Sequence, residues 1–454
     1  MTKRIKNFVF LLSLAAVAML CLLLEKEGEG SEAVMAGALL VFAILNWVLE
    51  TAPIAITALS LIVLVPFTGL MTFQEAVKAS FGNSVFGFFL GVLLLSYAFR
   101  DTGLGRAISK AIFSLFGRKP SNIVLGVMTC GAFLAMWITE VAAAAVIFPI
   151  AMSIWDKTKG RSDHAAFGKA IMLGVAWGCA FGGVATPIAT GANLIAVEYL
   201  QSSCGVNISF AQWMRIGVPI CLSLLAAGWM LLTFTLRDGA EIELDEEALV
   251  FGPREKKLAA VFVCAVVLWI GGSRLGITCH HVALLAAVAL FLPGMEVMEW
   301  KRAVSNISWE SIMLIASGVM LGDLLFETGV AQWMADLMFA PQLFEGGIFL
   351  RGVMIVLAVS VLKVLFSSNT VSGIVLVPIM ISLAQANGLS PWGVVAPCIF
   401  SSALSLVVIS SSPVNVIPYA SKAFTPKDMA CYGVVMTVIT AVIIGFWLMM
   451  LGVN

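Results

Sequence analysis

The stretch that decides the fold reads VLKVLFSSNTVSGIVLVP, at residues 361–378. Most of it is apolar, yet residues 367–370 place three hydroxyls and an amide at its centre, with Lys363 just upstream. Backbone inside a membrane must satisfy its own hydrogen bonds or line a wet cavity. These polar groups therefore predict a helix that breaks within the membrane.

The whole chain is too apolar for a soluble protein. Hydrophobic residues make up 61% of the 454 residues and charged residues 11%, whereas soluble domains carry about 25% charged residues. The 26 basic and 26 acidic residues cancel, so nothing suggests nucleic acid as a partner. We predict an all-α polytopic membrane protein whose surroundings are the lipid bilayer.

Nine apolar stretches are candidates for spanning helices, which need roughly 20 residues each. They cover residues 8–24, 34–49, 54–70, 85–99, 216–236, 258–272, 282–292, 312–326 and 434–451. Lys3, Arg4 and Lys6 before the first stretch resemble a signal peptide. No small-residue cleavage site precedes the acidic residues that follow, so we expect a retained first helix.

Four further apolar regions carry Gly, Pro, Ser, Thr or Asn near their centres. They are 122–156 and 349–385, which we predict as re-entrant hairpins, and 170–200 and 392–420, which we predict as broken helices. The hairpin tips are expected near Thr139 and Ser368.

The two halves of the chain repeat these features. Thr139 and Ser368 each lie ten residues before a proline, and Asn193 and Asn415 each end a later polar cluster. The first repeat is predicted to cover residues 1–228, with scaffold spans at 8–99 and a span at 216–236. The second is predicted to cover 229–454, with a cytoplasmic loop at 237–257, scaffold spans at 258–326 and a last span at 432–451.

The distribution of basic residues indicates the topology. With the N-terminus in the cytoplasm and the C-terminus outside, the outer side keeps only Lys26, Lys78, Arg215, Arg274 and Arg351. Such a bias is typical of a correctly threaded cytoplasmic (inner) membrane protein. The first hairpin then opens from the cytoplasm and the second from outside. Two similar halves of opposite orientation predict an inverted-repeat secondary transporter.

Helix breaks of this kind suit ion binding. A half-helix N-terminus attracts anions, and freed carbonyl groups coordinate hard cations. An ion channel can also use two re-entrant loops, but the chain has no filter-like glycine run. An intramembrane enzyme needs a His/Asp dyad or a metal cluster, and neither is evident in the sequence. We therefore expect a transporter with no enzymatic activity and no transition metal.

The chain resembles the divalent anion/sodium symporter family of carboxylate transporters over nearly its whole length. Each repeat of that family carries a Ser-Asn-Thr hairpin tip and a Thr-Pro-Pro-Asn-like break. Here the second tip reads SNT at residues 368–370, and the second break reads SPVN at residues 412–415. The resemblance implies a homodimer whose binding domain moves across the membrane as an elevator.

The resemblance also implies that the tips and breaks hold a small organic dianion of the dicarboxylate class together with sodium ions. The implied substrate-binding residues are Thr139, Glu140, Thr190, Asn193, Ser368, Asn369, Thr370, Ser412, Pro413 and Asn415. The implied cation-binding or coupling residues are Glu140, Ala189, Lys363, Ser367, Asn369 and Ser411.

The first tip departs from the family pattern, because it reads TEV and Glu140 stands in place of Asn. Three roles stay open for Glu140: a proton carrier, a stronger ligand for the first sodium ion, or a partner of Lys363. Lys363 could replace a sodium ion, which favours exchange, or its side chain could snorkel outward. The substrate also stays open, because sulfate, a sulfonate or a monocarboxylate fits as well.

Overall fold

The computed structural model of the chain describes residues 3–23, 31–234, 236, 241–242, 251–272, 276–338 and 346–453. The described residues form helices and turns and contain no strand. The predicted all-α class is therefore confirmed for this part of the chain. Most of the predicted cytoplasmic loop, at 237–240 and 243–250, lies outside the described residues.

The helices of the first half are α1 (Lys3–Leu23), α2 (Ser31–Val48), α3 (Ile54–Thr68), α4 (Phe73–Phe81), α5 (Ser84–Thr102), α6 (Leu104–Phe113), α7 (Pro120–Ala135), α8 (Glu140–Asp156), α9 (His164–Ala185), α10 (Gly191–Cys204) and α11 (Phe210–Thr233). Those of the second half are α12 (Pro253–Gly271), α13 (Cys279–Ala289), α14 (Trp300–Asn306), α15 (Trp309–Glu327), α16 (Val330–Met338), α17 (Ile348–Lys363), α18 (Asn369–Ala386), α19 (Pro391–Ser402), the 3-10 turn η3 (Ile409–Ser411), α20 (Pro413–Tyr419) and α21 (Pro426–Met450). Among the described residues, eight helices are long and apolar enough to cross a membrane: α1, α2, α5, α9, α11, α15, α18 and α21.

Several helices begin a few residues before the apolar stretches that predicted them. α11, α13 and α21 follow Ser209, Thr278 and Thr425, and each of these hydroxyls accepts a hydrogen bond from a backbone N–H in the first turn. Such N-caps stabilise the first turn of a helix. The polar first turns therefore lie outside the apolar stretches but belong to the same helices.

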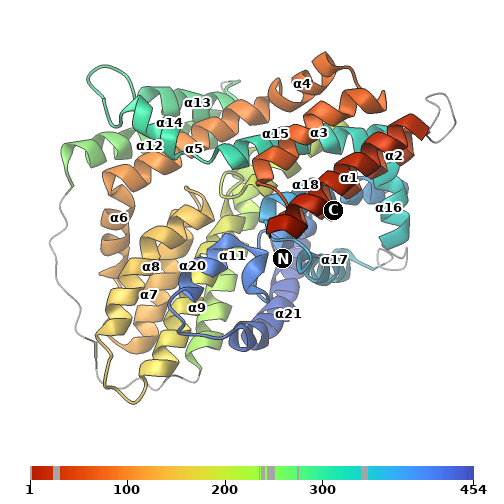
Figure 1. Cartoon of the computed structure of the whole chain (residues 1–454). Helices are drawn as coiled ribbons and strands as arrows, with labels where there is room; N and C mark the ends of the chain where they lie inside the picture. Colours follow the sequence, from red (N-terminus) through yellow and green to blue (C-terminus); the bar gives the residue numbers. More distant parts are fainter. Residues whose placement is uncertain are drawn as a thin grey trace.

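Figure 1 shows two groups of helices, with α1–α5 and α12–α15 above and α7–α9, α11, α20 and α21 below. α6 on the left and α16 on the right run down from the upper group. A glycine precedes each of these two helices: Gly103 between α5 and α6, and Gly329 between α15 and α16. Their φ angles are +82° and +74°. Glycine adopts this left-handed conformation without strain. The two halves thus turn into their connecting helices in the same way.

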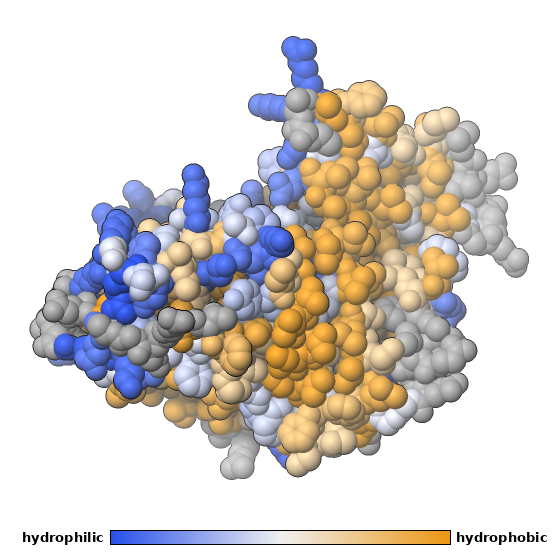
Figure 2. Space-filling view, turned by 90° about the horizontal axis from the view of Figure 1, so that it is seen from below, coloured by the Kyte–Doolittle hydropathy of each residue, from blue (hydrophilic) through white to orange (hydrophobic). Residues whose placement is uncertain are grey.

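The outer surface of the helices is suited to lipid. In α21, the side chains of Val434, Val438, Val442 and Met449 are exposed. Figure 2 shows hydrophobic side chains gathered in a broad belt on one face of the molecule, next to a hydrophilic region. A large continuous apolar surface marks contact with a membrane or with another protein. This surface agrees with a multi-pass membrane protein.

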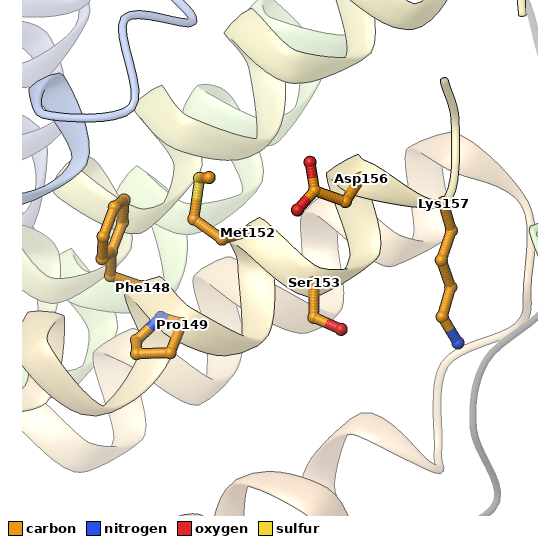
Figure 3. Close-up of a pocket in the computed structure, with 6 residues that line it drawn as sticks. All are labelled: Phe148, Pro149, Met152, Ser153, Asp156 and Lys157. Carbon is orange, nitrogen blue, oxygen red and sulfur yellow. The ribbon is translucent and has the colours of Figure 1, made fainter. Parts of the chain in front are cut away.

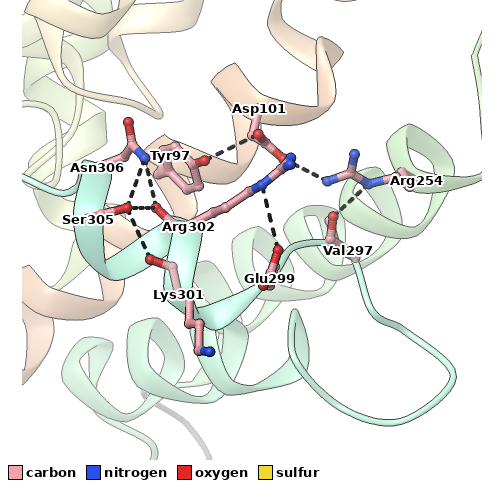
Figure 4. Close-up of polar contacts among 9 residues, drawn as sticks. All are labelled: Tyr97, Asp101, Arg254, Val297, Glu299, Lys301, Arg302, Ser305 and Asn306. Atoms are coloured by element: carbon pink, nitrogen blue, oxygen red, sulfur yellow. Dashed lines mark hydrogen bonds and ion pairs between the residues drawn. The ribbon is translucent and has the colours of Figure 1, made fainter.

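A polar cluster holds the edge of the upper group together (Figure 4). Arg254, near the start of α12, donates from Nη2 to Asp101 Oδ2 over 2.6 Å and from Nε to the Val297 carbonyl over 2.8 Å. The Tyr97 hydroxyl donates to Asp101 Oδ1 over 3.2 Å. These bonds tie the end of α5 to α12 and to the turn before α14.

Candidate functional site

Four helix interruptions converge in the structure. α7 and α8 are joined by residues 136–139, α9 and α10 by 186–190, α17 and α18 by 364–368, and α19 and α20 are separated by 403–412. α8 packs against α9 and α20, and α18 packs against α10 and α19. Polar helix ends from both halves of the chain therefore face one another.

A chain of three buried side chains crosses this region. Glu140 begins α8, Asn369 begins α18, and Lys363 ends α17. Asn369 Nδ2 donates to Glu140 Oε1 over 2.5 Å, and Lys363 Nζ donates to Asn369 Oδ1 over 2.5 Å. Glu140 is 6% exposed and Lys363 is 3% exposed. A single amide thus stands between a buried carboxylate and a buried ammonium.

Lys363 points into the protein, so the alternative in which it snorkels outward is wrong. Its ammonium also donates to Ser372 Oγ over 3.3 Å. Among the described residues no direct ion pair joins it to Glu140, because Asn369 lies between them. Removing a charge from water is costly unless an opposite charge and hydrogen bonds compensate it. The two buried charges and the amide satisfy this requirement together, which explains why the lysine turns inward.

The amide of Asn369 uses all of its hydrogen-bonding capacity. Its Oδ1 also accepts from Ser405 Oγ over 3.0 Å, and its Nδ2 also donates to the Ala403 carbonyl over 3.2 Å. A side-chain amide has two donors and an oxygen that accepts twice. The neighbouring charges decide its orientation, because the oxygen faces the ammonium and the NH₂ group faces the carboxylate. A ligand contacts this amide only by displacing one of these bonds.

Two glycines allow close packing beside the tips. A Cβ built on Gly183 would lie 3.1 Å from Glu140 Oε2 and 3.2 Å from Thr190 Cγ2. A Cβ built on Gly191 would lie 2.7 Å from Thr370 Oγ1. Glu140, Thr190 and Thr370 therefore pack closely around two positions at which a side chain larger than that of glycine would not fit without a shift of its neighbours.

Helix α15 of the upper group covers this region. Ile315 Cδ1 lies 3.1 Å from the Cβ that would be built on Gly191. Further along, the Tyr199 hydroxyl of α10 donates to the Gly318 carbonyl of α15 over 2.7 Å. The candidate site therefore lies where α10 and α18 pack against helix α15 of the upper group.

Asn193 and Asn415 occupy equivalent places in the two breaks. The Nδ2 atom of Asn193 donates to the carbonyls of residues 183 and 186, over 2.8 and 2.9 Å. The Nδ2 atom of Asn415 donates to the carbonyls of residues 405 and 408, over 2.7 and 3.2 Å. The partners lie ten and seven residues upstream in both cases. Both Oδ1 atoms are buried and have no hydrogen-bond partner within the described parts of the chain.

The helix N-termini at the four interruptions are not alike. Thr139, Thr190 and Ser412 cap α8, α10 and α20, because their hydroxyls accept from a backbone N–H of the first turn. Ser368 makes no such bond at the start of α18 in the described structure. Uncapped N–H groups carry partial positive charge and bind anions. α18 therefore presents the one uncapped N-terminus of these four described helices.

The remaining predicted residues lie at the edges of the same region. Ala189 is buried in the first break, and its N–H donates to the Thr186 carbonyl over 3.4 Å. Ser367 is half-buried in the second tip. Ser411 is buried beside Ser405, which donates to its carbonyl over 3.3 Å. Pro413 is exposed and forms the first residue of α20.

Four residues of this region were missed by the sequence analysis. Ser372 and Ser405 hydrogen-bond to the Lys363–Asn369 pair, and Gly183 and Gly191 allow Glu140, Thr190 and Thr370 to pack closely. Ser405 precedes Asn415 by ten residues, and Gly183 precedes Asn193 by ten residues in the first half. That shared spacing was a usable signal. Ser372 and Gly191 offered none, because isolated serines and glycines are common in membrane helices.

A separate open pocket of about 700 Å³ lies along the second half of α8. It is lined by Phe148, Pro149, Met152, Ser153, Asp156 and Lys157 (Figure 3). Phe148 follows Glu140 by eight residues, which is about 12 Å along a helix. The pocket is therefore a groove beside the hairpin and does not contain the polar chain at the tips.

Comparisons with known proteins agree with this architecture. The chain matches the family model of the sodium:sulfate symporter transmembrane region over residues 4–453. It is 27% identical over 436 residues to the sodium-dependent dicarboxylate transporter SdcS of Staphylococcus aureus (strain USA300). The matched region covers 88% of this chain and 82% of the relative.

Two solved transporters share the fold. The YdaH transporter of Alcanivorax borkumensis has a TM-score of 0.58 at 13% identity. The match covers 83% of this chain and 88% of the YdaH chain. MtrF of Neisseria gonorrhoeae has a TM-score of 0.52 at 12% identity. The match covers 82% of this chain and 83% of the MtrF chain. A helical transporter fold and a family model that matches almost every residue lead to one assignment. The chain belongs to the sodium:sulfate symporter family, that is, to the divalent anion/sodium symporters.

Proposed function

We propose that this protein is a secondary active transporter that carries small organic dianions of the dicarboxylate class across the cytoplasmic membrane, coupled to sodium. The observation that carries the proposal is the uncapped N-terminus of α18 at the meeting point of four helix ends. Its free N–H groups and the hydroxyls of Ser368 and Thr370 suit one carboxylate group of a substrate. The name of the SdcS relative supports the dicarboxylate class.

The cation sites are proposed at the two asparagines of the breaks. Oδ1 of Asn193 and Oδ1 of Asn415 are buried acceptors without partners among the described residues. Hard cations take uncharged oxygens of this kind as ligands. Ala189 lies in the first break with Asn193, and Ser367 and Ser411 lie in the second half of the chain with Asn415. The carbonyls or hydroxyls of these residues are proposed to complete the coordination. The residues present therefore fit two sodium ions.

The substrate itself is proposed to lie between the two tips. Thr139, Glu140 and Thr190 contribute from the first repeat, and Ser412 and Pro413 contribute from the second. A site made of helix ends and a few side chains binds reversibly, which a carrier needs because it must release its cargo.

The proposed transport mechanism is an elevator built from inverted repeats at 1–228 and 229–454. In its support, the hairpin α7–α8 corresponds to α17–α18, and the broken pair α9–α10 corresponds to α19–α20. The upper group would stay fixed in a homodimer, while the lower group together with α10, α17, α18 and α19 would carry the site. The N-terminus is proposed to face the cytoplasm and the C-terminus the outside.

Uptake into liposomes tests the function. Reconstituted protein is expected to accumulate radiolabelled succinate several-fold more when an inward sodium gradient is imposed than with sodium equal on both sides. Ser368→Ala with Thr370→Val should abolish this uptake, because it removes both hydroxyls at the uncapped helix end. The absence of succinate flux under every ionic condition would refute the dicarboxylate assignment and leave sulfate as the next anion to test.

A second candidate function rests on the ammonium of Lys363. It donates to Oδ1 of Asn369, a residue that the family resemblance places at a cation site. A fixed ammonium there favours an anion exchanger, and Glu140 as a proton carrier would favour proton coupling. Exchange predicts succinate uptake that requires succinate inside the liposomes and does not depend on a sodium gradient. Proton coupling predicts uptake that follows an imposed pH gradient at constant sodium.

A further inference from the structure

Helix α17 carries two buried cations whose surroundings differ. Lys363 at the end of the helix is bonded to Asn369 and Ser372. Arg351 near the start is 7% exposed. In the described part of the chain its Nε atom is buried without a hydrogen-bond partner, and no carboxylate or carbonyl group pairs with the rest of the guanidinium. Burying a charge without a partner is costly, so an anion that reaches this guanidinium binds favourably.

The N-terminus of α17 offers further donors beside this arginine. The helix begins at Ile348 after Gly347, which supplies no side-chain cap. The first N–H groups of a helix have no partner within it and carry partial positive charge. Arg351 is the fourth residue of the helix, and long side chains on a helix extend toward its N-terminus. The guanidinium and the uncapped helix end therefore form one cationic site.

The donors of this site match a phosphate group. A guanidinium donates to two phosphate oxygens through parallel N–H groups, and the N–H groups of a helix end are common phosphate ligands. The first hairpin has no such arginine, because α7 begins at Pro120 and its fourth residue is Ile123. The site is therefore a feature of the second hairpin that the repeat does not impose.

The surroundings of the site favour a lipid as the carrier of the phosphate. α17 packs closely on α21 (Figure 1), because a Cβ built on Gly352 would lie 3.1 Å from the Gly445 Cα. Exposed apolar side chains of both helices flank this contact: Phe349, Leu350, Phe446 and Met449. The proposed topology places this end of α17 at the outer surface of the membrane, where lipid phosphates lie.

We infer that Arg351 and the N-terminus of α17 bind the phosphate group of a phospholipid in the outer leaflet, whose acyl chains lie on the exposed apolar side chains of α17 and α21. The site is separate from the proposed substrate site. Arg351 precedes Lys363 by twelve residues, which is about 18 Å along a helix. The inference therefore goes beyond the transport function and does not depend on the identity of the substrate.

Thermal unfolding of the purified full-length protein in detergent tests this site. Phosphatidylglycerol is compared with a diacylglycerol of the same acyl chains, which lacks the phosphate, and with inorganic phosphate, which lacks the chains. Phosphatidylglycerol is expected to raise the unfolding midpoint by several degrees, because a ligand that binds the folded state stabilises it. The other two should change it little. An equal rise with inorganic phosphate would overturn the assignment to a lipid, and an equal rise with diacylglycerol would overturn the recognition of phosphate.

Substitution of the arginine identifies where the lipid binds. Arg351→Met is expected to lose most of the rise with phosphatidylglycerol, while its midpoint without lipid stays equal or increases, because an unpaired charge is no longer buried. Arg215→Met is the matched control, since Arg215 is also predicted on the outer side but is exposed, and it should keep the full rise. The same rise in Arg351→Met as in the wild type would overturn the inference.

Gly347→Asp tests the site without removing the arginine, so the test holds even where Arg351→Met folds poorly. A Cβ on Gly347 meets no atom within 4 Å, and aspartate is a favoured N-cap residue. Its carboxylate is expected to occupy the anion position, which raises the midpoint without lipid and removes the response to phosphatidylglycerol. Gly347→Ala adds no acceptor and should keep the response. A full response in Gly347→Asp would contradict the proposed site.

Discussion

Replacing Lys363 by methionine is expected to lower the free energy of unfolding by about 3–5 kcal/mol. The substitution leaves the Glu140 carboxylate buried with no positive charge beyond the Asn369 amide, and it removes the donors to Asn369 and Ser372. The measurement is thermal unfolding of the purified protein in detergent, where the midpoint should fall by several degrees.

Two further variants serve as controls for this result. Lys169 pairs with Asp428 at 2.5 Å, but these side chains are 34% and 23% exposed, so Lys169→Met should cost about 1 kcal/mol or less. The double variant Lys363→Met with Glu140→Gln should recover most of the stability, because no unpaired charge stays buried. If Lys363→Met alone unfolds at the wild-type temperature, the two charges do not stabilise each other.

Replacing Gly182 by alanine is expected to destabilise the first hairpin by about 1–3 kcal/mol or more. Its Cβ would lie 2.2 Å from the Ala132 carbonyl oxygen and 2.7 Å from the Ala132 Cα. These are backbone atoms of α7, so no side-chain rotation relieves the clash and the two helices must separate. α7 leads directly into the first tip, so succinate uptake should fall further than the amount of folded protein.

Gly37→Ala is the matched control, because Gly37 also lies in a helix and a Cβ there meets no atom within 4 Å. Alanine is favoured over glycine in a helix by about 0.5–1 kcal/mol, so this variant should be neutral or slightly more stable. Wild-type stability and uptake in Gly182→Ala would mean that close contact between α7 and α9 is not needed.

Much of the fold was predictable because a membrane restricts the possibilities. Long apolar stretches have few alternatives to helices in lipid, and the described structure is helical in all nine predicted spans. The helix starts were less predictable, since Ser209, Thr278 and Thr425 extend helices with polar first turns. The short helices α4 and α14 lack the length of a span and were not anticipated.

The candidate site was harder to predict than the fold. The polar residues near Thr139 and Ser368 stood out in apolar surroundings, so their positions at helix ends followed from local chemistry. Their roles remain predictions. The partners of Asn369 lie far apart in the sequence, with Glu140 229 residues upstream and Ser405 36 residues downstream. No local pattern encodes such contacts.

The sequence by itself determined that this chain is a helical membrane protein whose helices are interrupted by polar residues. The reason is that, in a membrane, apolar stretches must form helices that satisfy their own backbone hydrogen bonds, and this depends on the local sequence alone. Only the tertiary structure decided that Lys363 turns inward, that Asn369 separates it from Glu140, and that α18 alone among the four converging helices is uncapped. The physical reason is that electrostatic and hydrogen-bond free energies depend on distance and burial. Those quantities are set only when the two halves of the chain come together.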